Sequence, residues 1–207
     1  MVMTCGYRNY SDEHYTADHV AEAVVRHFSP RGKCLEPFKG EGAFFRHMPA
    51  GTDWCEIRDG RDFFKCSVPC DWIVTNPPFS NLTKVFEHAF NLAGNCVFVI
   101  PISKYWSSAP RIESVARYGG LVEIAHLGRG RDIGFDIGFP FAAMYFKRGY
   151  HGHIRQTILT PNKCKWCGHS IDAHDRQYGC AEDGCDCETP NDPSSAAGVS
   201  PSAATRC

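Results

Sequence analysis

The chain has 207 residues, a formal net charge of −1 at pH 7 and 43% hydrophobic residues. This length suits one ordinary domain with a small appendage. The balanced charge excludes a protein that binds nucleic acid through its bulk charge, so any basic patch must be local. No apolar run reaches the about 20 residues of a membrane helix, and the N-terminus lacks the apolar core of a secretion signal. The scattered cysteines therefore indicate reduced thiols in a cytoplasmic protein.

Helices and strands are predicted to alternate along the first 150 residues. Val20, Val24 and Phe28 have helical spacing, which predicts a helix over 16–28 with Thr16 as its N-cap. This order of elements predicts an α/β fold with a doubly wound, mostly parallel sheet. The other expected helices cover 40–48, 82–93 and 111–119, and the expected strands cover 32–37, 52–57, 71–76, 95–102, 120–128 and 139–147.

Two glycines, Gly40 and Gly42, lie between the first expected strand and the helix that follows it. Ligands of parallel sheets bind at the carboxyl ends of strands, where glycines allow a close backbone approach and positive φ. The N-terminus of the helix can hold an anionic group. The absence of G-x-G-x-x-G disfavours a dinucleotide fold, and the absence of G-K-[ST] excludes a P-loop. An ordinary tight turn is the alternative interpretation.

Polar and aromatic residues follow the next expected strands. Glu56 lies at the end of the strand over 52–57, where an acid can accept hydrogen bonds from ribose hydroxyls. Asp62 and Phe63 are expected at the end of a further short strand, where they offer a polar group and an aromatic face to an adenine ring. Together with the glycine turn, these residues predict a nucleoside site whose charged end is not a polyphosphate.

The strand over 71–76 is followed by two prolines and an aromatic residue, in the order Asn76, Pro77, Pro78, Phe79. The prolines restrict the preceding backbone to extended forms and lack N–H donors, so the local carbonyls are held as acceptors. The side-chain oxygen of Asn76 is a further acceptor, and Phe79 supplies a flat face. Two fixed acceptors match the two N–H donors of an exocyclic amine, which predicts a receptor for an aromatic amine such as adenine N6.

These motifs, in their order along the chain, resemble the phage-type DNA N6-adenine methyltransferases. Such enzymes use S-adenosylmethionine on a Rossmann-like class I fold with a mostly parallel seven-stranded sheet whose last strand is antiparallel. The N-P-P-F motif is specific for methylation of a planar amino group, and protein-glutamine and some RNA methyltransferases share it. The chain departs from the family at Ala17, where proline is frequent, and at Glu36, where Asp is commoner. The resemblance covers residues 10–150 and is carried by segments 15–16, 36–42, 55–57, 60–64 and 75–80.

The resemblance implies a cofactor site. Tyr15 and Thr16 would lie against the methionine part of S-adenosylmethionine. Glu56 would hold the ribose, and Asp62 with Phe63 would hold the adenine. The main cradle would be formed by Glu36, Pro37, Phe38, Gly40 and Gly42, and Asn76 would border it.

The resemblance also implies the catalytic residues. Asn76 and the Pro77 carbonyl would bind the target amine, next to Pro78 and with Phe79 stacked on the base. These acceptors would draw lone-pair density onto N6 and align it with the methyl group. The implied reaction is direct methyl transfer without a covalent nucleophile, and a duplex target would have to be flipped out.

Little of the chain remains for recognition of a DNA sequence. The best candidate is the segment 127–139, which carries Arg129, Arg131, Phe135 and Phe139 among glycines. Arginine can contact phosphates or guanine, and an aromatic side chain can fill the space of a flipped base. A hairpin loop with surface arginines is the alternative. We expect specificity that is either relaxed or confined to a short site.

The segment 164–187 has the cysteine spacing of a metal site. Cys164 and Cys167 form a C-x2-C pair that would supply two of the four ligands of a structural Zn²⁺. A segment of ~24 residues cannot bury a core, so the metal would provide its folding energy. A reduced, disordered tail with chance cysteines is the alternative, and His169 is expected to be a bystander. The other two ligands are expected from His174, Cys180, Cys185 and Cys187.

We therefore predict a methyltransferase domain over 10–160, a zinc knuckle over 161–188 and a disordered tail over 189–207. DNA is the expected partner, and the expected location is the cytoplasm, that of the host cell if a phage encodes the protein. Methylation of RNA or of a protein glutamine is one alternative. A catalytically inactive, zinc-containing nucleic-acid-binding protein is the other.

Overall fold

The structure is a computed structural model that describes residues 14–135, 138–159, 174–175 and 179–180. The chain divides into two compact units, residues 1–161 and 162–207. In the second unit, β8 (His174–Asp175) pairs antiparallel with β9 (Gly179–Cys180). No helix within the described ranges has the length and apolarity needed to cross a membrane.

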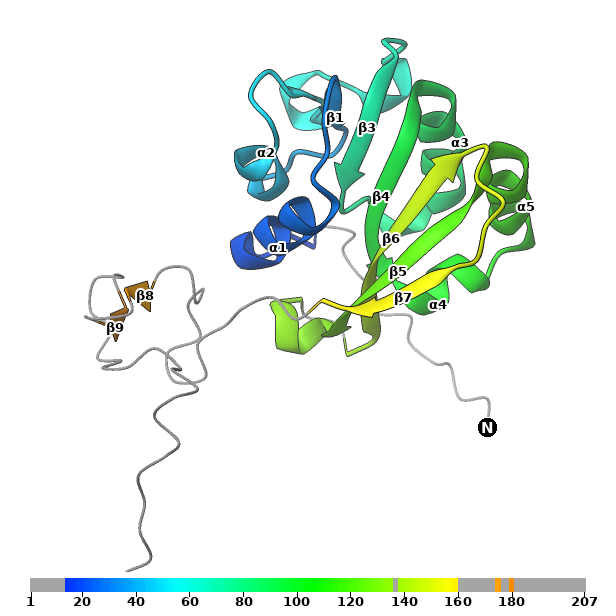
Figure 1. The fold of residues 1–207 in the computed structure, drawn as a ribbon. Coiled ribbons are helices and arrows are strands. Elements are labelled where there is room, and N and C mark those ends of the chain that lie inside the picture. The colour runs from blue at the N-terminus through cyan, green and yellow to red at the C-terminus, as the bar shows by residue number, and fades with distance from the viewer. Residues whose placement is uncertain (1–13, 136–137, 160–173, 176–178, 181–207) are drawn as a thin grey trace, which may run out of the picture. The chain divides into compact units, whose positions relative to one another are not determined.

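A seven-stranded sheet forms the centre of the first unit (Figure 1). Its strands are β1 (Cys34–Glu36), β2 (Asp53–Trp54), β3 (Cys70–Thr75), β4 (Ala93–Pro101), β5 (Gly119–Arg129), β6 (Pro140–Arg148) and β7 (Arg155–Ile158). They lie in the order β2–β1–β3–β4–β6–β5–β7, and only β6 runs against its neighbours. The carboxyl ends of the six parallel strands therefore share one rim with the turn from β5 to β6.

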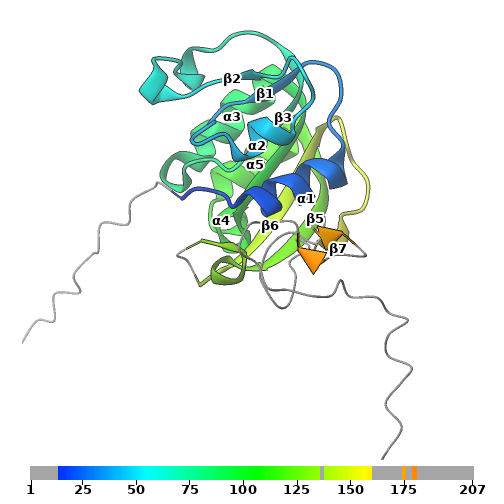
Figure 2. The ribbon, with the colours of Figure 1, turned by 90° about the vertical axis from the view of Figure 1, so that its left-hand side faces the viewer.

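Helices cover both faces of this sheet. They are α1 (Asp18–Phe28), α2 (Ala43–His47), α3 (Leu82–Leu92), α4 (Ile102–Trp106) and α5 (Ala109–Tyr118). In Figures 1 and 2, α1 lies on one side of the sheet and α3 and α5 on the other. Consecutive residues of β6 follow this division because side chains of a strand alternate between faces: Tyr145 contacts Phe28 of α1, and Phe146 contacts Phe86 of α3.

The apolar run over 95–102 becomes β4 at the centre of the sheet. Its residues from Cys96 to Ile100 are fully buried because α1, α3 and the neighbouring strands exclude water from both faces. Phe98 of β4 stacks on Phe86 with 4.6 Å between ring centroids. This rigid central part places the ends of β1, β3 and β4 at the common rim.

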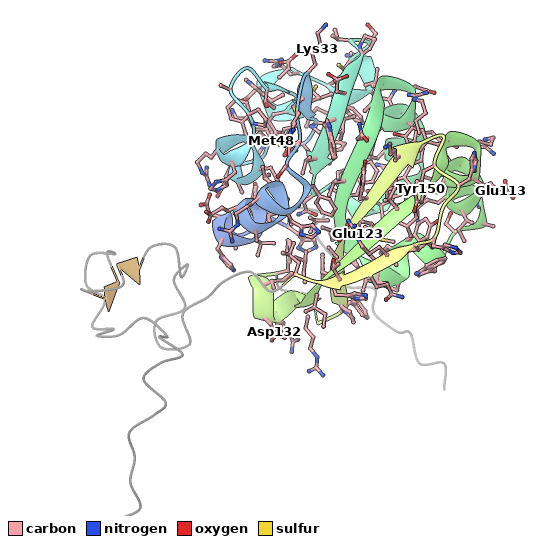
Figure 3. All side chains as sticks on the ribbon, in the orientation of Figure 1. Lys33, Met48, Glu113, Glu123, Asp132 and Tyr150 are labelled. Carbon is pink, nitrogen blue, oxygen red and sulfur yellow. The ribbon has the colours of Figure 1, made fainter. Side chains whose placement is uncertain are left out.

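One buried carboxylate reinforces the parallel pairing of the edge strand β7 with β5. Figure 3 labels this residue, Glu123, where β5 and β7 lie side by side. Its Oε1 accepts a hydrogen bond from the Thr157 hydroxyl (2.6 Å) and lies 2.7 Å from His27 Nε2, and its Oε2 accepts from Arg155 Nε (3.1 Å). Burial opposes ionisation, but these hydrogen bonds lower the pKa of Glu123. The carboxylate therefore joins β7 and the end of α1 to β5.

The link from β6 to β7 runs across the start of β5 at close range. A Cβ atom on Gly119 would lie 2.3 Å from the Gly149 nitrogen, and one on Gly120 would lie 2.6 Å from the Tyr150 carbonyl oxygen. Real Cβ atoms do not approach backbone atoms so closely. The crossing therefore requires glycine at both positions.

The predicted helices and the six predicted longer strands are all present, with corrections at their ends. α1 begins at Asp18 with Ala17 as its N-cap, and no side chain caps it, so the prediction of Thr16 as the N-cap was wrong. β2 ends at Trp54, and Glu56 is instead the N-cap of a short 3-10 helix, η1 (Ile57–Asp59).

The expected short strand at Asp62 and Phe63 was also wrong. The Asp62 side chain accepts a hydrogen bond from the Phe64 amide and caps a second 3-10 helix, η2 (Phe63–Lys65). The sheet still has seven strands because β7 adds one at the opposite edge. The antiparallel strand is therefore the sixth along the chain and not the last.

Candidate cofactor and target-amine site

A glycine turn follows β1 at the carboxyl rim. Gly40 (φ +50°) and Gly42 (φ +85°) both have the left-handed conformation that favours glycine. The turn is closed by a hydrogen bond from the Gly42 amide to the Lys39 carbonyl (2.7 Å), and the Lys39 amide donates to the Cys55 carbonyl (3.0 Å). A Cβ atom at Gly40 would lie 3.3 Å from the Tyr15 ring, so this turn and Tyr15 approach closely.

The carboxyl group of Glu36 lies beneath this turn, at the end of β1, and is only 1% exposed. Its Oε1 accepts hydrogen bonds from the Phe38 amide (3.1 Å) and the Thr75 hydroxyl, whereas its buried Oε2 has no partner among the residues that the structure describes. Burial raises the pKa of Glu36 to about 8, against the lowering effect of the two hydrogen bonds. Glu36 is therefore a buried acid with one oxygen left for a ligand.

Glu56 bridges the glycine turn and the next strand end. Its Oε2 accepts from the Gly40 amide (2.8 Å), and its Oε1 accepts from the Arg58 amide (3.2 Å) and side chain (3.3 Å). Burial opposes ionisation, but the hydrogen bonds from Arg58 and Gly40 lower the pKa of this carboxyl. Arg58 also donates to the Tyr15 hydroxyl (3.0 Å). The sequence analysis missed Arg58, whose only sequence signal is its position two residues after Glu56.

A small cavity of about 40 Å³ lies between the glycine turn, Tyr15 and Asn76, and Glu36, Glu56 and Arg58 are not among the residues that line it. It brings together five predicted cofactor residues that are far apart in the sequence, Tyr15, Thr16, Phe38, Gly40 and Asn76, with His14, Lys39, Glu41, Ala43 and Phe44 completing its lining. The predicted adenine residues do not line it. Phe63 is 2% exposed and packs edge-on against Phe38 at 5.1 Å, so it supports the cavity wall from behind.

Asn76 follows β3 on the other side of the same cavity. Its Nδ2 donates to the His14 carbonyl oxygen (2.7 Å), and within the described part of the chain its buried Oδ1 has no hydrogen-bond partner. A carbonyl only accepts, so this contact fixes which end of the amide faces His14. The Asn76 side chain therefore presents a fixed, unused acceptor.

Phe79, at the start of the 3-10 helix η3 (Phe79–Asn81), is 8% exposed. It stacks on the His14 ring at 5.6 Å with 22° between the planes, and it also contacts Phe141 at 5.9 Å in a tilted arrangement. His14 thus supplies both the partner of the Asn76 amide and the cover of Phe79. The sequence analysis missed this residue because no local pattern marks a contact with residues more than 60 positions away.

The turn from β5 to β6 lies at the same rim and contains the 3-10 helix η4 (Gly130–Ile133), where Figure 3 labels Asp132. Arg129 and Arg131 are exposed, and Phe139 is 62% exposed. The expectation of an exposed Phe135 was wrong: this ring is 3% exposed and stacks on Phe141 at 4.6 Å with 7° between the planes.

An exposed aromatic residue at this rim was not predicted. Trp106 is 50% exposed at the end of α4, the short helix that begins directly after β4.

Most of the predicted zinc ligands lie outside the described residues, namely Cys164, Cys167, Cys185 and Cys187. The expected bystander His169 lies outside them as well. The backbones of His174 and Cys180 pair opposite each other in β8 and β9. In the described part of the chain, no group of three or more Cys, His, Asp or Glu residues is arranged to hold a metal ion.

Solved structures match this architecture, although no family model and no curated protein matches the chain. A protein assigned to the class I S-adenosylmethionine-dependent methyltransferases, from Listeria monocytogenes, has a TM-score of 0.54 and 10% identity over 77% of this chain and 69% of its own. The chain has the class I methyltransferase fold. The prediction of a Rossmann-like methyltransferase fold with a seven-stranded sheet is thus confirmed.

Two further structures with this fold belong to enzymes that act on nucleic acids. The M protein of the EcoKI type I restriction enzyme has a TM-score of 0.53 and 12% identity over 74% of this chain and 46% of its own. The 23S rRNA methyltransferase ErmE has a TM-score of 0.51 and 14% identity over 67% of this chain and 72% of its own. This chain therefore spans less than half of the M protein's length.

Proposed function

We propose that this protein is an S-adenosylmethionine-dependent methyltransferase that acts on the N6 amine of adenine in DNA. The observation that carries the proposal is the Asn76 amide, whose Nδ2 is held by the His14 carbonyl while its Oδ1 is buried and unpartnered. An unpaired buried acceptor costs about 1–3 kcal/mol. A target amine that donates to Asn76 Oδ1 and to the Pro77 carbonyl would remove this cost.

The neighbouring residues fit the cofactor. The unpartnered Oε2 of Glu36 suits a cationic amino group, and the glycines at Gly40 and Gly42 keep side chains out of the turn. Glu56 suits the ribose hydroxyls. The cavity of about 40 Å³ is too small for a nucleoside, so Tyr15, which lines it and whose hydroxyl accepts a hydrogen bond from Arg58, has to move when the cofactor binds. S-adenosylmethionine would supply an activated methyl group on its sulfonium centre.

The chain's own residues would position and polarise the target. The two N–H groups of the N6 amine would donate to Asn76 Oδ1 and to the Pro77 carbonyl. These hydrogen bonds would hold the amine in one orientation and increase the electron density of its lone pair. Phe79 would provide the stacking face. Since His14 now covers Phe79, a base entering the site has to replace the His14 ring.

Exposed groups at the rim suit a DNA backbone and an opened base pair. Arg129 and Arg131 can contact phosphates, and Phe139 and Trp106 present exposed apolar surface on the same rim. The protein as a whole carries a net charge of −1, so this local group has to supply the attraction.

RNA is the second candidate substrate, because the fold is about as similar to the rRNA methyltransferase ErmE as to the M protein. Protein glutamine, which presents the same planar amide nitrogen to an N-P-P-F site, is the third. A structural Zn²⁺ in the segment 161–188 is part of the same proposal and rests on the cysteine spacing.

The test is transfer of a labelled methyl group to DNA and to RNA, with nucleoside analysis of the products. We expect N6-methyladenine in DNA. Replacement Asn76→Ala removes one oriented hydrogen bond, typically worth about 3 kcal/mol or a hundredfold in rate. Cofactor affinity should change far less, because Glu36 and Glu56 remain.

The matched control is Asn81→Ala, five residues further along the chain. Asn81 is the N-cap of α3, but its exposed side-chain amide makes no capping hydrogen bond. This variant should keep wild-type turnover. The proposal fails if the product is 5-methylcytosine, or if Asn76→Ala turns over as fast as Asn81→Ala. Label found in RNA and not in DNA would show that the substrate is RNA, the second candidate.

A further inference from the structure

One buried charge of the first unit takes no part in the reaction proposed above. The described part of the chain buries three charged side chains, those of Glu36, Arg111 and Glu123. Glu36 belongs to the predicted cofactor site, and Glu123 is paired with Arg155 and His27. Arg111, in the first turn of α5, is 7% exposed, and no carboxylate of the described residues forms an ion pair with it. A guanidinium stays charged in a protein, so these residues leave a buried cation without a counter-ion.

The hydrogen bonds of Arg111 go to neutral groups. Its Nη1 donates to the Lys104 carbonyl oxygen of α4, and its Nη2 donates to the Thr83 hydroxyl of α3 (3.2 Å). The guanidinium carbon lies 5.9 Å from the centre of the Phe86 ring, and the buried Nε has no hydrogen-bond partner in the part of the chain that the structure describes. Burial disfavours the charged form and lowers the pKa of Arg111. Neutral acceptors thus hold the side chain in place without compensating its charge.

The acidic residues of the two longer helices at this place do not supply the missing charge. α3 and α5 carry one acid each, Glu87 and Glu113, and both are exposed. Residues two positions apart point to nearly opposite sides of an α-helix, so Glu113 faces away from Arg111, and Figure 3 labels it on the outer side of α5. Two exposed residues near the hydrogen bonds of Arg111 are instead basic, Lys84 in the first turn of α3 and Lys104 in α4. The surroundings of Arg111 therefore favour an anion from outside the chain.

Arg111 lies at the rim that carries the target-amine site. α4 begins directly after β4, α5 follows it, and α3 begins directly after η3, so all three helices start at the carboxyl ends of the strands. Thr83, which accepts from Arg111, is four residues after Phe79, the predicted stacking face for the base. A flipped nucleotide remains joined to a phosphate on each side of its sugar, and protein contacts to such phosphates commonly come from arginine and from threonine hydroxyls. Arg111 and Thr83 are thus the right groups beside the predicted place of the base.

We propose that Arg111 and the Thr83 hydroxyl bind a backbone phosphate of the nucleic-acid substrate, next to the target nucleotide. Thr83 is partly exposed, and its hydroxyl, which accepts from Arg111, keeps its own proton to donate to a phosphate oxygen. The phosphate supplies the negative charge that the guanidinium lacks, and a hydrogen bond between charged groups is strong where water is excluded. This inference rests on the proposed function, because it takes a nucleic acid as the substrate. It also separates the candidates, since a protein glutamine brings no phosphate.

The first test measures how DNA binding by the full chain depends on salt. The probe is a fluorescent duplex with one mismatched adenine, because a mismatched base is the least costly to flip out. Arg111→Met should bind roughly tenfold more weakly at low salt, and the slope of log affinity against log salt concentration should become shallower by about one unit. The control Arg117→Met removes an exposed arginine from the last turn of the same helix and should keep the wild-type slope. Equal slopes of the two variants overturn the proposal.

The second test identifies the phosphate and leaves the buried arginine in place. A neutral methylphosphonate replaces the phosphate on the 5′ side or on the 3′ side of the mismatched adenine. At one of these two positions the wild type should lose roughly tenfold in affinity. Thr83→Val, which keeps the volume of a partly exposed side chain, should lose much less there, because it has already lost one donor to that phosphate. If the wild type and Thr83→Val respond equally at both positions, the proposal is wrong.

Inorganic phosphate separates this site from the proposed function. Thermal unfolding is followed in phosphate and in chloride at matched ionic strength. Phosphate stabilises folded proteins in general, so the variants are compared: the gain in Tm should be larger for the wild type and Arg117→Met than for Arg111→Met. An equal gain in all three proteins overturns the proposal. If the gains differ as expected but the wild type binds neither DNA nor RNA, the proposed function fails and the assignment to a nucleic-acid phosphate fails with it, while Arg111 remains an anion site.

Discussion

The buried acid Glu36 makes the stability of the protein depend on pH in an unusual direction. In the unfolded chain this carboxyl ionises above its ordinary pKa of 4.5, whereas burial holds the folded-state pKa at about 8. Between these values the folded protein keeps a proton that the unfolded chain loses. The free energy of unfolding therefore falls by up to about 1.4 kcal/mol per pH unit from about pH 4.5 to 8 on account of this group, and levels off above pH 8.

Replacement Glu36→Gln removes this dependence, because the amide is neutral at every pH and its oxygen can still accept from Phe38 and Thr75. The whole shift corresponds to about 5 kcal/mol. We expect Glu36→Gln and the wild type to be similarly stable near pH 4.5, and the variant to gain steadily above it. Urea unfolding at pH 5, 6, 7 and 8 measures the difference. A difference that stays constant across this range would refute the assignment.

The same acid predicts proton release when the cofactor binds. A cationic amino group next to Oε2 favours the ionised carboxyl, so binding at pH 7 should release close to one proton, and the release should fade above pH 8. Calorimetry in buffers of different ionisation enthalpy counts the protons. Glu36→Gln should release none from this position and bind more weakly. Proton release that is equal in both proteins would place its source elsewhere.

Three further changes test other parts of the fold and site. Gly42→Val should lower S-adenosylmethionine affinity at least tenfold in calorimetry, because its side chain fills the turn. The control Gly51→Val has a similar φ of +82° and open space around it, and should keep the wild-type affinity. Equal effects of the two changes would contradict the assignment of the glycine turn to the cofactor site. Glu123→Gln should lower the free energy of unfolding by about 2 kcal/mol at pH 7. The difference should shrink as the pH falls below about 4.5, where this carboxyl is protonated first in the unfolded chain and, at lower pH, in the folded protein; acid unfolding curves that remain equally spaced would contradict this. Metal analysis of the reduced protein should find one Zn²⁺, lost on truncation after Pro161, and a metal-free full chain would refute the zinc knuckle.

The parts of the fold that sequence reasoning predicts are those with dense local patterns. β4 is buried on both faces, which gives it a continuous apolar run. α1 and α3 are buried on one face, which gives them apolar residues at helical spacing. β7 has no such pattern, because its side chains are mostly exposed and its place depends on the distant Glu123. Phe63 was expected at the end of a short strand, yet its ring packs against Phe38 from a 3-10 helix, a contact that no local pattern indicates.

The candidate site shows the same limit. The sequence predicts the order of the strand-end residues, and the structure brings Tyr15, Gly40 and Asn76 to one cavity. It does not predict the partners that orient them. The His14 carbonyl that holds Asn76 is 62 positions away, and Phe135 could not be distinguished from an exposed tip until Phe141 was placed against it. Local patterns thus indicate which chemistry is present, and tertiary contacts determine which atoms remain free.

The position of β7 has a consequence for how the chain folds as it leaves the ribosome. β5 is synthesised before both of its neighbours in the sheet, and its outer edge pairs with residues 155–158. Until those residues emerge, the backbone of β5 lacks its hydrogen-bonding partner on that side, and Glu123 lacks Arg155 and Thr157. A nascent chain stalled before residue 155 therefore presents an open strand edge with an unpaired acid beside it, and is the stage at which we expect chaperone binding or aggregation to be greatest.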